Sequence, residues 1–294
     1  MKVLVTGGNG QLGTEIRKCF ERGYTELGVP NVLKQENTVH TIDVRELDIT
    51  VLEDVFELFK QERYDAVINC AAYTNVNKCE TEIDLAYKVN AIGARNVAIA
   101  CEKINAKLIH ISTDYVFSGD TRKPYIESDV CCPQSVYGSS KYLGECYVRD
   151  FCTRYFIVRT SWLYGYHGKN FVKSIMSQGL KKGAVTVVAD QRGNPTNAAD
   201  LAHHIIKLID TDEYGVYHAT GHGECSWFEF ANAIIATSGI NAVVSPCTSD
   251  QFYSPAKRPA FSSLDNLMFR ITVGDEFRDW QTALKCFMHN YKGE

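Results

Sequence analysis

The feature that most constrains the fold of this chain is a glycine-rich turn directly after an apolar segment at the N-terminus. Residues 2–6 (Lys-Val-Leu-Val-Thr) predict a β-strand, and glycines follow at Gly7, Gly10 and Gly13. Apolar residues at helical spacing, beginning with Leu12, predict a helix after this turn. Free backbone N–H groups and the dipole at a helix N-terminus attract anions, and glycines without Cβ atoms let a pyrophosphate approach closely. The segment therefore predicts a dinucleotide-binding site.

The second predicted strand ends in an acidic residue. Residues 39–43 read Val-His-Thr-Ile-Asp, and a carboxylate at this place in a dinucleotide fold accepts hydrogen bonds from the adenosine ribose. Asp43 lies further from Gly13 than the usual ~20 residues, because residues 23–38 lengthen the first connection. Asp43 would repel a 2′-phosphate and favours NADH, whereas Arg45 would offset that repulsion and admit NADPH. Both cofactors remain open.

Alternation of strand and helix continues through the first half of the chain. Further apolar strands are predicted at residues 65–73, 107–114, 156–161, 185–190 and 215–218, and a helix is predicted at 198–209. Ser226 is expected to cap a helix at 227–238, with Glu229 completing a capping box. This alternation over residues 1–161 predicts an α/β fold with a Rossmann-type, doubly wound parallel sheet. Residues 162–294 are expected to form mainly a smaller C-terminal substrate-binding lobe, with segments at about 185–221 returning to the main sheet.

Three polar positions have both a structural and a functional interpretation. Asp48 or Thr50 is expected to cap the helix predicted at residues 52–61, and capping is the preferred role for Thr50. Asn90 lies within a helix predicted at residues 85–103, where it is either solvated or supports a site. These alternatives stay open on the sequence alone.

The chemistry is predicted at Tyr137 and Lys141, which lie four residues apart on one face of a predicted helix. A phenol has a pKa of about 10. A neighbouring ammonium group favours the phenolate and would bring Tyr137 toward general acid–base catalysis. The pair alone is weak evidence, because this spacing is common on solvated helices. Thr113 adds support, since it ends a predicted strand, where α/β sheets place ligands, although strand-end capping would also explain it.

Composition excludes several other functions. The formal net charge of −4 and the pI near 6.1 argue against a nucleic-acid binder or a membrane-surface protein. No apolar run approaches the roughly 20 residues that span a bilayer, and the N-terminus has no signal-peptide pattern. The 11 cysteines are odd in number and irregularly spaced, so we expect thiols in a reducing cytoplasm rather than disulfides or a zinc site. Those in apolar periodic stretches are Cys19, Cys70, Cys101 and Cys146.

Together, the glycine turn, the strand-end hydroxyl and Tyr-x-x-x-Lys resemble the extended short-chain dehydrogenase/reductase family, and more narrowly its dTDP-4-dehydrorhamnose reductase branch. The resemblance extends almost from end to end. Further matching segments are Asn69–Thr74, Ser112–Phe117, Arg159–Trp162, Asp190–Thr196 and Arg258–Pro259 with Ser262. It implies NAD(P)H-dependent reduction of the 4-keto group of dTDP-4-dehydro-L-rhamnose to dTDP-L-rhamnose, a precursor of cell-surface polysaccharide.

The resemblance also implies a role for individual residues. The dinucleotide would be contacted by Gly7, Gly10, Gln11, Leu12, Gly13, Asp43, Asp48, Ile49, Ala71, Ala72, Tyr73, Thr74, Tyr137 and Lys141. In the catalytic set, Tyr137 would donate the proton, Thr113 would hydrogen-bond the carbonyl, and Lys141 would hold the ribose and tune Tyr137. The sugar nucleotide would be bordered by Thr113, Asp114, Trp162 and Arg258. Arg258 is the candidate partner for the diphosphate, which a guanidinium group suits.

Other interpretations remain. Some members of this family bind magnesium at a homodimer contact through acidic residues, and Glu15 matches one such position. The other ligands find no match, so Glu15 is otherwise interpreted as an acid in the first turn of its helix and no metal residue is predicted. The alternatives to the implied function are a reductase of another nucleotide 4-ketosugar and a non-catalytic, NADP-binding regulator resembling the regulatory subunit of methionine adenosyltransferase.

Overall fold

The computed structural model describes residues 1–252 and 254–291. Residues 253 and 292–294, which fall in the predicted C-terminal lobe, lie outside the described residues. A six-stranded sheet in the order β10-β5-β4-β3-β1-β2 forms the centre, and every neighbouring pair is parallel. Its strands are β1 (Lys2–Thr6), β2 (Thr38–Ile42), β3 (Ala66–Asn69), β4 (Lys107–Thr113), β5 (Tyr155–Thr160) and β10 (Gly215–His218). The predicted doubly wound parallel sheet is confirmed.

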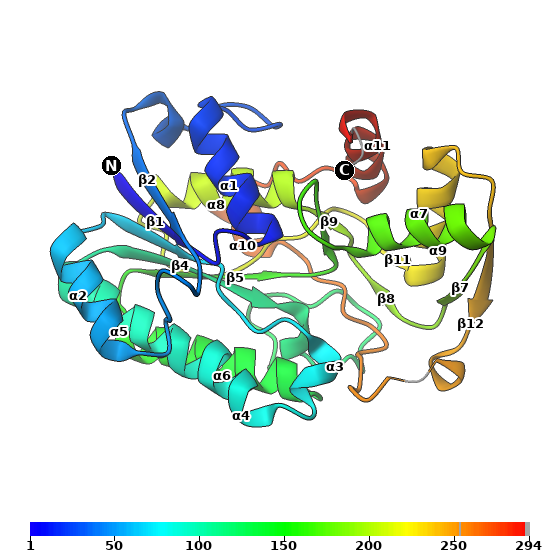
Figure 1. The fold of residues 1–294 in the computed structure, drawn as a ribbon, viewed down its shortest axis with the longest axis horizontal. Coiled ribbons are helices and arrows are strands. Elements are labelled where there is room, and N and C mark those ends of the chain that lie inside the picture. Colours follow the sequence, from blue (N-terminus) through cyan, green and yellow to red (C-terminus); the bar gives the residue numbers. More distant parts are fainter. Residues whose placement is uncertain (253, 292–294) are drawn as a thin grey trace.

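Helices cover both faces of this sheet (Figure 1). One face carries α1 (Gln11–Arg22), α8 (Ala198–Ile209) and α10 (Leu267–Ile271), and the other carries α2 (Leu52–Glu62), α5 (Ala94–Ile104) and α6 (Val136–Phe151). Side chains alternate along each strand, so Val3 and Val5 pack in one core while Leu4 packs in the other. Burial on both faces explains why the strands read as continuous apolar runs.

The order of the strands places a ligand site at one position of the sheet. The chain passes from β1 to β2 on one side and then to β3 on the other, so β1 and β3 flank the point where the winding direction changes. In open α/β sheets, ligands bind beyond the carboxyl ends of the strands at this point. The glycine turn between β1 and α1 lies there.

A smaller group of elements lies beside the sheet and has its own core. It contains α7 (Phe171–Lys182), α9 (Trp227–Ser238), α11 (Trp280–Asn290) and the parallel pair β7 (Ala184–Val188) and β12 (Val243–Cys247). Of the segments expected to return to the main sheet, β10 pairs with β5, whereas β7 pairs with β12 instead. The expectation is therefore wrong for β7, because an apolar run does not specify which strand it will join.

The helix caps predicted from the sequence are partly confirmed. The predicted capping box of α9 is confirmed: the Ser226 hydroxyl accepts from the Glu229 N–H at 3.1 Å, and the Glu229 carboxylate accepts from the Ser226 N–H at 2.6 Å. The predicted cap of α2 is wrong. Its N-cap is Val51, without a side-chain cap, and Asp48 accepts instead from the N–H of Thr50.

The remaining elements are short. They are η1 (Asn31–Lys34), α3 (Val76–Cys79), α4 (Ile83–Tyr87), η2 (Lys88–Gly93), η3 (Asp114–Val116), β6 (Leu163–Tyr164), β8 (Arg192–Gly193), β9 (Thr196–Asn197), β11 (Cys225–Ser226) and η4 (Ser249–Gln251). The predicted helix at 85–103 corresponds to α4, the π-helical segment η2 and α5 in succession.

All 11 cysteines are free thiols, as predicted. Cys19 and Cys101 are buried, whereas Cys70 and Cys146 are only partly buried. In the part of the chain that the structure describes, no helix is both long enough and apolar enough to cross a membrane.

Candidate active site

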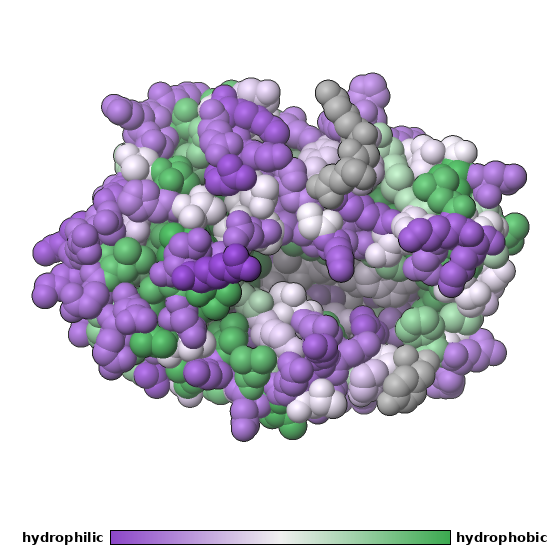
Figure 2. All heavy atoms as spheres, viewed as in Figure 1, coloured by the Kyte–Doolittle hydropathy of each residue, from purple (hydrophilic) through white to green (hydrophobic). Residues whose placement is uncertain are grey.

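A cleft of about 850 Å³ opens beyond the carboxyl ends of the sheet strands. Figure 2 shows this hollow near the middle of the face drawn there. Every site residue expected from the sequence lines it, namely Gly7, Gly10, Gln11, Leu12, Gly13, Asp43, Asp48, Ile49, Ala71, Ala72, Tyr73, Thr74, Thr113, Asp114, Tyr137, Lys141, Trp162 and Arg258. The structure therefore brings together residues from both halves of the chain.

The glycine turn has a shape that larger residues would disrupt. Gly7 has a φ of 63°, and a Cβ atom there would lie 2.8 Å from the backbone nitrogen of Ala71. A Cβ atom on Gly13 would lie 2.5 Å from the carbonyl oxygen of Gly7. The N-cap of α1 is Gly10, which has no side chain to occupy the first N–H groups of the helix. These features suit a dinucleotide pyrophosphate.

Asp43 is held rigidly at the end of β2. Its carboxylate accepts hydrogen bonds from the N–H of Asn9 at 3.0 Å and from the N–H of Val44 at 2.7 Å. Asn9 belongs to the glycine turn, so the carboxylate has a fixed position relative to that turn. Arg45, the residue expected to offset its charge, is exposed.

Asn90 supports the site, which decides between the two interpretations of this residue. Its side chain is buried, accepts from the N–H of Tyr73 at 2.8 Å and donates to the carbonyl of Tyr73 at 3.1 Å. It also donates to the hydroxyl of Ser140 at 3.0 Å. Asn90 thus fixes the segment after β3 against the helix that carries Tyr137 and Lys141.

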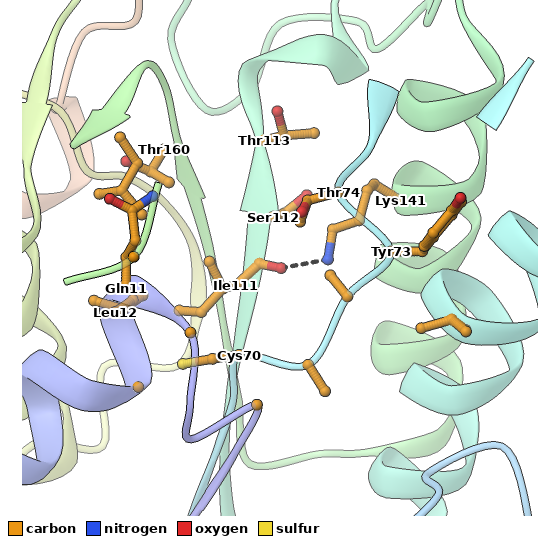
Figure 3. A pocket seen from close by; sticks show the side chains of 18 of the residues that line it. Gln11, Leu12, Cys70, Tyr73, Thr74, Ile111, Ser112, Thr113, Lys141 and Thr160 are labelled. Carbon is orange, nitrogen blue, oxygen red and sulfur yellow. Dashed lines mark hydrogen bonds between the residues drawn. The ribbon is translucent and has the colours of Figure 1, made fainter. Parts of the chain in front are cut away.

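Tyr137, Lys141 and Thr113 converge in the cleft. Helix α6 begins after Ser135, whose hydroxyl accepts from the N–H of Gly138 at 3.1 Å, and Tyr137 and Lys141 both line the cleft from this helix. The ammonium of Lys141 donates to the carbonyl oxygen of Ile111 at 2.6 Å (Figure 3). The Thr113 hydroxyl lies close enough to Tyr137 to lower the pKa of the phenol.

Burial controls the ionisation of these groups. It raises the pKa of Tyr137, and the hydrogen bond from Thr113 opposes that shift only partly. The expected lowering by Lys141 is not met: Lys141 is not among the main causes, and its ammonium contacts Ile111 instead. Burial lowers the pKa of Lys141 to about 8, opposed by Glu145. Tyr137 is therefore a neutral phenol at neutral pH, the form that donates a proton.

Asp114 lies beside this group and is buried. Burial raises its pKa to about 6, while hydrogen bonds from Ser262 and Thr113 oppose the shift. The Thr113 hydroxyl donates to the Asp114 carboxylate at 2.9 Å. Among the described residues, the second carboxylate oxygen of Asp114 is buried without a hydrogen-bond partner.

The opposite wall of the cleft is aromatic. Trp162 adopts a left-handed φ of 47°, and its ring stacks on Trp227 with the centroids 3.5 Å apart and the planes at 5°. Gly193 allows this arrangement, because a Cβ atom there would lie 2.7 Å from the Trp162 indole. Arg258 donates to the hydroxyl of Tyr115 at 3.1 Å and lines the same cleft.

Sequence reasoning missed a group of lining residues from the second half of the chain. These are Gly168, Lys169, Asn170, Phe171 and Trp227. The amide of Asn170 donates to Gln11 at 3.0 Å, which joins the loop before α7 to the glycine turn. Ser226 had been identified as a helix cap, but nothing in the local sequence indicated that Trp227 would face the cleft.

Glu15 is not an ordinary first-turn acid. It is the fifth residue of α1, it is buried, and its carboxylate lies 3.7 Å from the His167 ring nitrogen. Burial is the main reason that its pKa is raised. Within residues 1–252 and 254–291, no group of three or more His, Cys, Asp or Glu side chains is arranged to hold a metal ion.

The doubly wound sheet, the glycine turn at its switch point and the Tyr-x-x-x-Lys pair in one cleft define a Rossmann-fold oxidoreductase of the short-chain dehydrogenase/reductase class. The family model described as "RmlD substrate binding domain" matches residues 1–292. The chain belongs to this family.

Individual relatives agree with this assignment over nearly their full length. The spore coat polysaccharide biosynthesis protein SpsK of Bacillus subtilis is 38% identical over 288 residues, covering 98% of this chain and 96% of that protein. A dTDP-4-dehydrorhamnose reductase structure from Clostridium acetobutylicum is 44% identical, with a TM-score of 0.93 and coverage of 98% and 99% of the two chains. The Bacillus anthracis dTDP-4-dehydrorhamnose reductase, solved in complex with NADP, is 42% identical with a TM-score of 0.91, covering 98% of each chain.

Proposed function

We propose that this protein is an NAD(P)H-dependent reductase that converts dTDP-4-dehydro-L-rhamnose to dTDP-L-rhamnose. The observation that carries the proposal is the convergence of Tyr137, Thr113 and Lys141 in a cleft that also contains the glycine turn. The relatives named dTDP-4-dehydrorhamnose reductase support the choice of substrate. The NADP bound by one of them supports the choice of cofactor.

The cofactor would be held along the cleft from the glycine turn to α6. Gly7, Gly10 and Gly13 leave room for the pyrophosphate, and Asp43 lies where the adenosine ribose is expected. Lys141 would hold the other ribose. The residues that would contact the rest of the dinucleotide are Gln11, Leu12, Asp48, Ile49, Ala71, Ala72, Tyr73 and Thr74. When bound, the reduced nicotinamide supplies hydride to C4 of the sugar.

Tyr137 donates the proton that the reduced ketone oxygen takes up. Its raised pKa keeps the phenol protonated, so the acid is present at any physiological pH. In the structure the Thr113 hydroxyl donates to Asp114, and its oxygen accepts from the Tyr115 N–H at 3.2 Å. Donation by Thr113 to the ketone oxygen, expected from the sequence, requires the hydroxyl to rotate away from Asp114.

The direct test follows cofactor absorbance after addition of freshly prepared dTDP-4-dehydro-L-rhamnose, with NADH and NADPH in separate reactions. We expect ketosugar-dependent oxidation of the cofactor and formation of dTDP-L-rhamnose. A panel of other nucleotide 4-ketosugars tests the substrate. Faster turnover of another sugar would reassign the substrate, and no turnover of any of them would favour the regulatory alternative.

Asp43 provides a test of cofactor choice. Its fixed carboxylate would repel a 2′-phosphate and accept hydrogen bonds from a 2′-hydroxyl. Replacing Asp43 with Asn should therefore raise the ratio of kcat/KM for NADPH to that for NADH by about tenfold, equivalent to ~1.4 kcal/mol. Steady-state kinetics with both cofactors would measure it. An unchanged ratio would mean that the carboxylate does not contact this ribose.

Arg258 provides a test of substrate binding. Removing a guanidinium that pairs with a diphosphate should cost about 1.5–3 kcal/mol, or roughly 10–100-fold in KM for the sugar nucleotide, with little change in KM for NADH. Arg258→Met is the variant, and Lys257→Met, which removes the adjacent charge that contacts Gln134, is the control. Equal effects of the two substitutions would contradict a specific role for Arg258.

A further inference from the structure

A buried ion pair begins one helical turn after Lys141 on α6. Glu145 follows Lys141 by four residues, just as Lys141 follows Tyr137, so the three side chains lie along one face of the helix. The carboxylate of Glu145 is 0% exposed, and Arg159 on β5 is 1% exposed. The guanidinium donates to both carboxylate oxygens, Nε at 2.9 Å and Nη2 at 2.7 Å.

Glu145 also connects the helix to the strand that carries Thr113. The hydroxyl of Ser112, the residue before Thr113, donates to Glu145 at 2.5 Å. One carboxylate therefore ties α6 to the carboxyl ends of both β4 and β5. The remaining guanidinium contacts of Arg159 are to Cys131, His218 and the Glu127 carbonyl. The network fixes the catalytic face of α6 relative to Thr113.

The charges around Lys141 are few. The titratable groups that interact with its ammonium are Cys70 at the end of β3, His110 on β4 and Glu145 on its own helix. Burial raises the pKa of Cys70 to about 12 and lowers the pKa of His110 well below its usual value, so both are neutral near pH 7. Among these groups of the described chain, Glu145 is the only carboxylate, and it pairs with Arg159.

On the side away from Lys141, Glu145 lies near two arginine side chains. Arg159 pairs with it directly, Arg149 is a more distant cation on α6, and Cys131 lies against Arg159 with a thiol pKa that burial raises to about 11. A buried ion pair adds little net stability compared with apolar residues of similar volume, because desolvation offsets the attraction. Stability therefore does not account for a charge at this place.

We propose that Glu145 is a positioning residue for the reduction: it fixes the face of α6 that carries Tyr137 and Lys141, and its negative charge keeps Lys141 in the ammonium form. The inference rests on the proposed function of Lys141 in the reductase reaction. It adds a group, outside the cleft, that acts on the catalytic set through Lys141.

The test removes both charges of the pair. Glu145→Gln alone would leave Arg159 buried without its partner and would destabilise the fold. The double variant Glu145→Gln/Arg159→Met keeps an acceptor for Ser112, and we expect its melting temperature to stay close to that of the wild type. The control is Asp200→Asn/Arg278→Met, which removes another ion pair, formed by a buried Asp200 and a partly buried Arg278, whose members do not line the cleft.

The first measurement follows the protonation of Lys141 directly and does not depend on catalysis. In protein labelled with ¹³C-lysine, the Lys141 Cε signal, assigned with Lys141→Arg, is followed against pH. An opposite charge nearby favours the charged form, so its loss should move the Lys141 midpoint down by about one pH unit. The control variant should leave the midpoint unchanged.

The second measurement is the pH profile of turnover. Lys141 is charged below its pKa of about 8, so loss of Glu145 should shift the alkaline limb of the profile to lower pH. We expect turnover of the double variant to fall about fivefold near pH ~8 and to approach wild type near pH ~6, where Lys141 is protonated again. A role limited to stability would give wild-type turnover at every pH in the stable double variant.

The outcomes separate the two proposals. An unchanged Lys141 midpoint in the double variant would overturn the role of Glu145, even if the wild type reduces the ketosugar. A shifted midpoint with an unchanged pH profile would overturn the link between Glu145 and the reaction. It would mean that the charge of Lys141 does not limit turnover. Absence of ketosugar reduction by the wild type would contradict the proposed function itself.

Discussion

Replacing Tyr137 with phenylalanine is expected to lower turnover about 10²–10⁴-fold while leaving NADH affinity nearly unchanged, as loss of a general acid would. The ring of Tyr137 stays in contact with Tyr115, with the centroids 5.5 Å apart in the present structure, so the cleft should keep its shape. Only the phenol hydroxyl is removed. Steady-state kinetics would give the turnover, and fluorescence titration would give the cofactor affinity.

Tyr142→Phe is the matched control for this substitution. Tyr142 lies on the same helix but does not line the cleft, and we expect its variant to keep wild-type turnover. A Tyr137→Phe protein that retains most of its activity would remove Tyr137 from the role of acid. A variant that loses cofactor affinity as strongly as turnover would assign Tyr137 to binding instead.

Replacing Lys141 with methionine is expected to impair binding and turnover together. The ammonium is proposed to hold the cofactor ribose, and a hydrogen bond to a charged group contributes about 1.5–3 kcal/mol, so NADH affinity should fall roughly 10–100-fold. Turnover should also fall at saturating cofactor, because the ribose would lose the contact that positions the nicotinamide for hydride transfer. Methionine fills a similar apolar volume, which limits damage to the core.

The contrast between the two variants is itself informative. Tyr137→Phe should change turnover alone, whereas Lys141→Met should change turnover and cofactor affinity. Lys103→Met, on α5 outside the cleft, serves as the control for loss of a lysine. Wild-type cofactor affinity in Lys141→Met would contradict the ribose contact.

Much of the fold followed from short-range patterns in the sequence. The strand and glycine turn at the N-terminus, the apolar strands and the helix at 198–209 depend on local periodicity and composition, which act over a few residues. The capping box at Ser226 and Glu229 is likewise local. The cap of α2 was wrong because Asp48 satisfies a loop N–H, that of Thr50, instead of a helix terminus.

The site was predictable where its residues follow strand ends or helical spacing. The positions of Thr113, Tyr137 and Lys141 belong to this group. Trp227 and the loop before α7 were not predictable, because long-range packing of the smaller lobe brings them to the cleft. The ionisation of Tyr137 was misjudged for a related reason: burial and the Ile111 carbonyl, not sequence spacing, determine which groups interact.

The central claim is that Tyr137 delivers a proton to the oxygen on C4 of a dTDP-sugar. A crystal structure of the protein with NADPH and dTDP-L-rhamnose would test it most directly. We predict that the C4 hydroxyl lies within about 2.6–3.2 Å of the Tyr137 hydroxyl, the distance that proton transfer requires. A sugar bound with its C4 hydroxyl out of reach of Tyr137, next to another proton donor, would contradict the account.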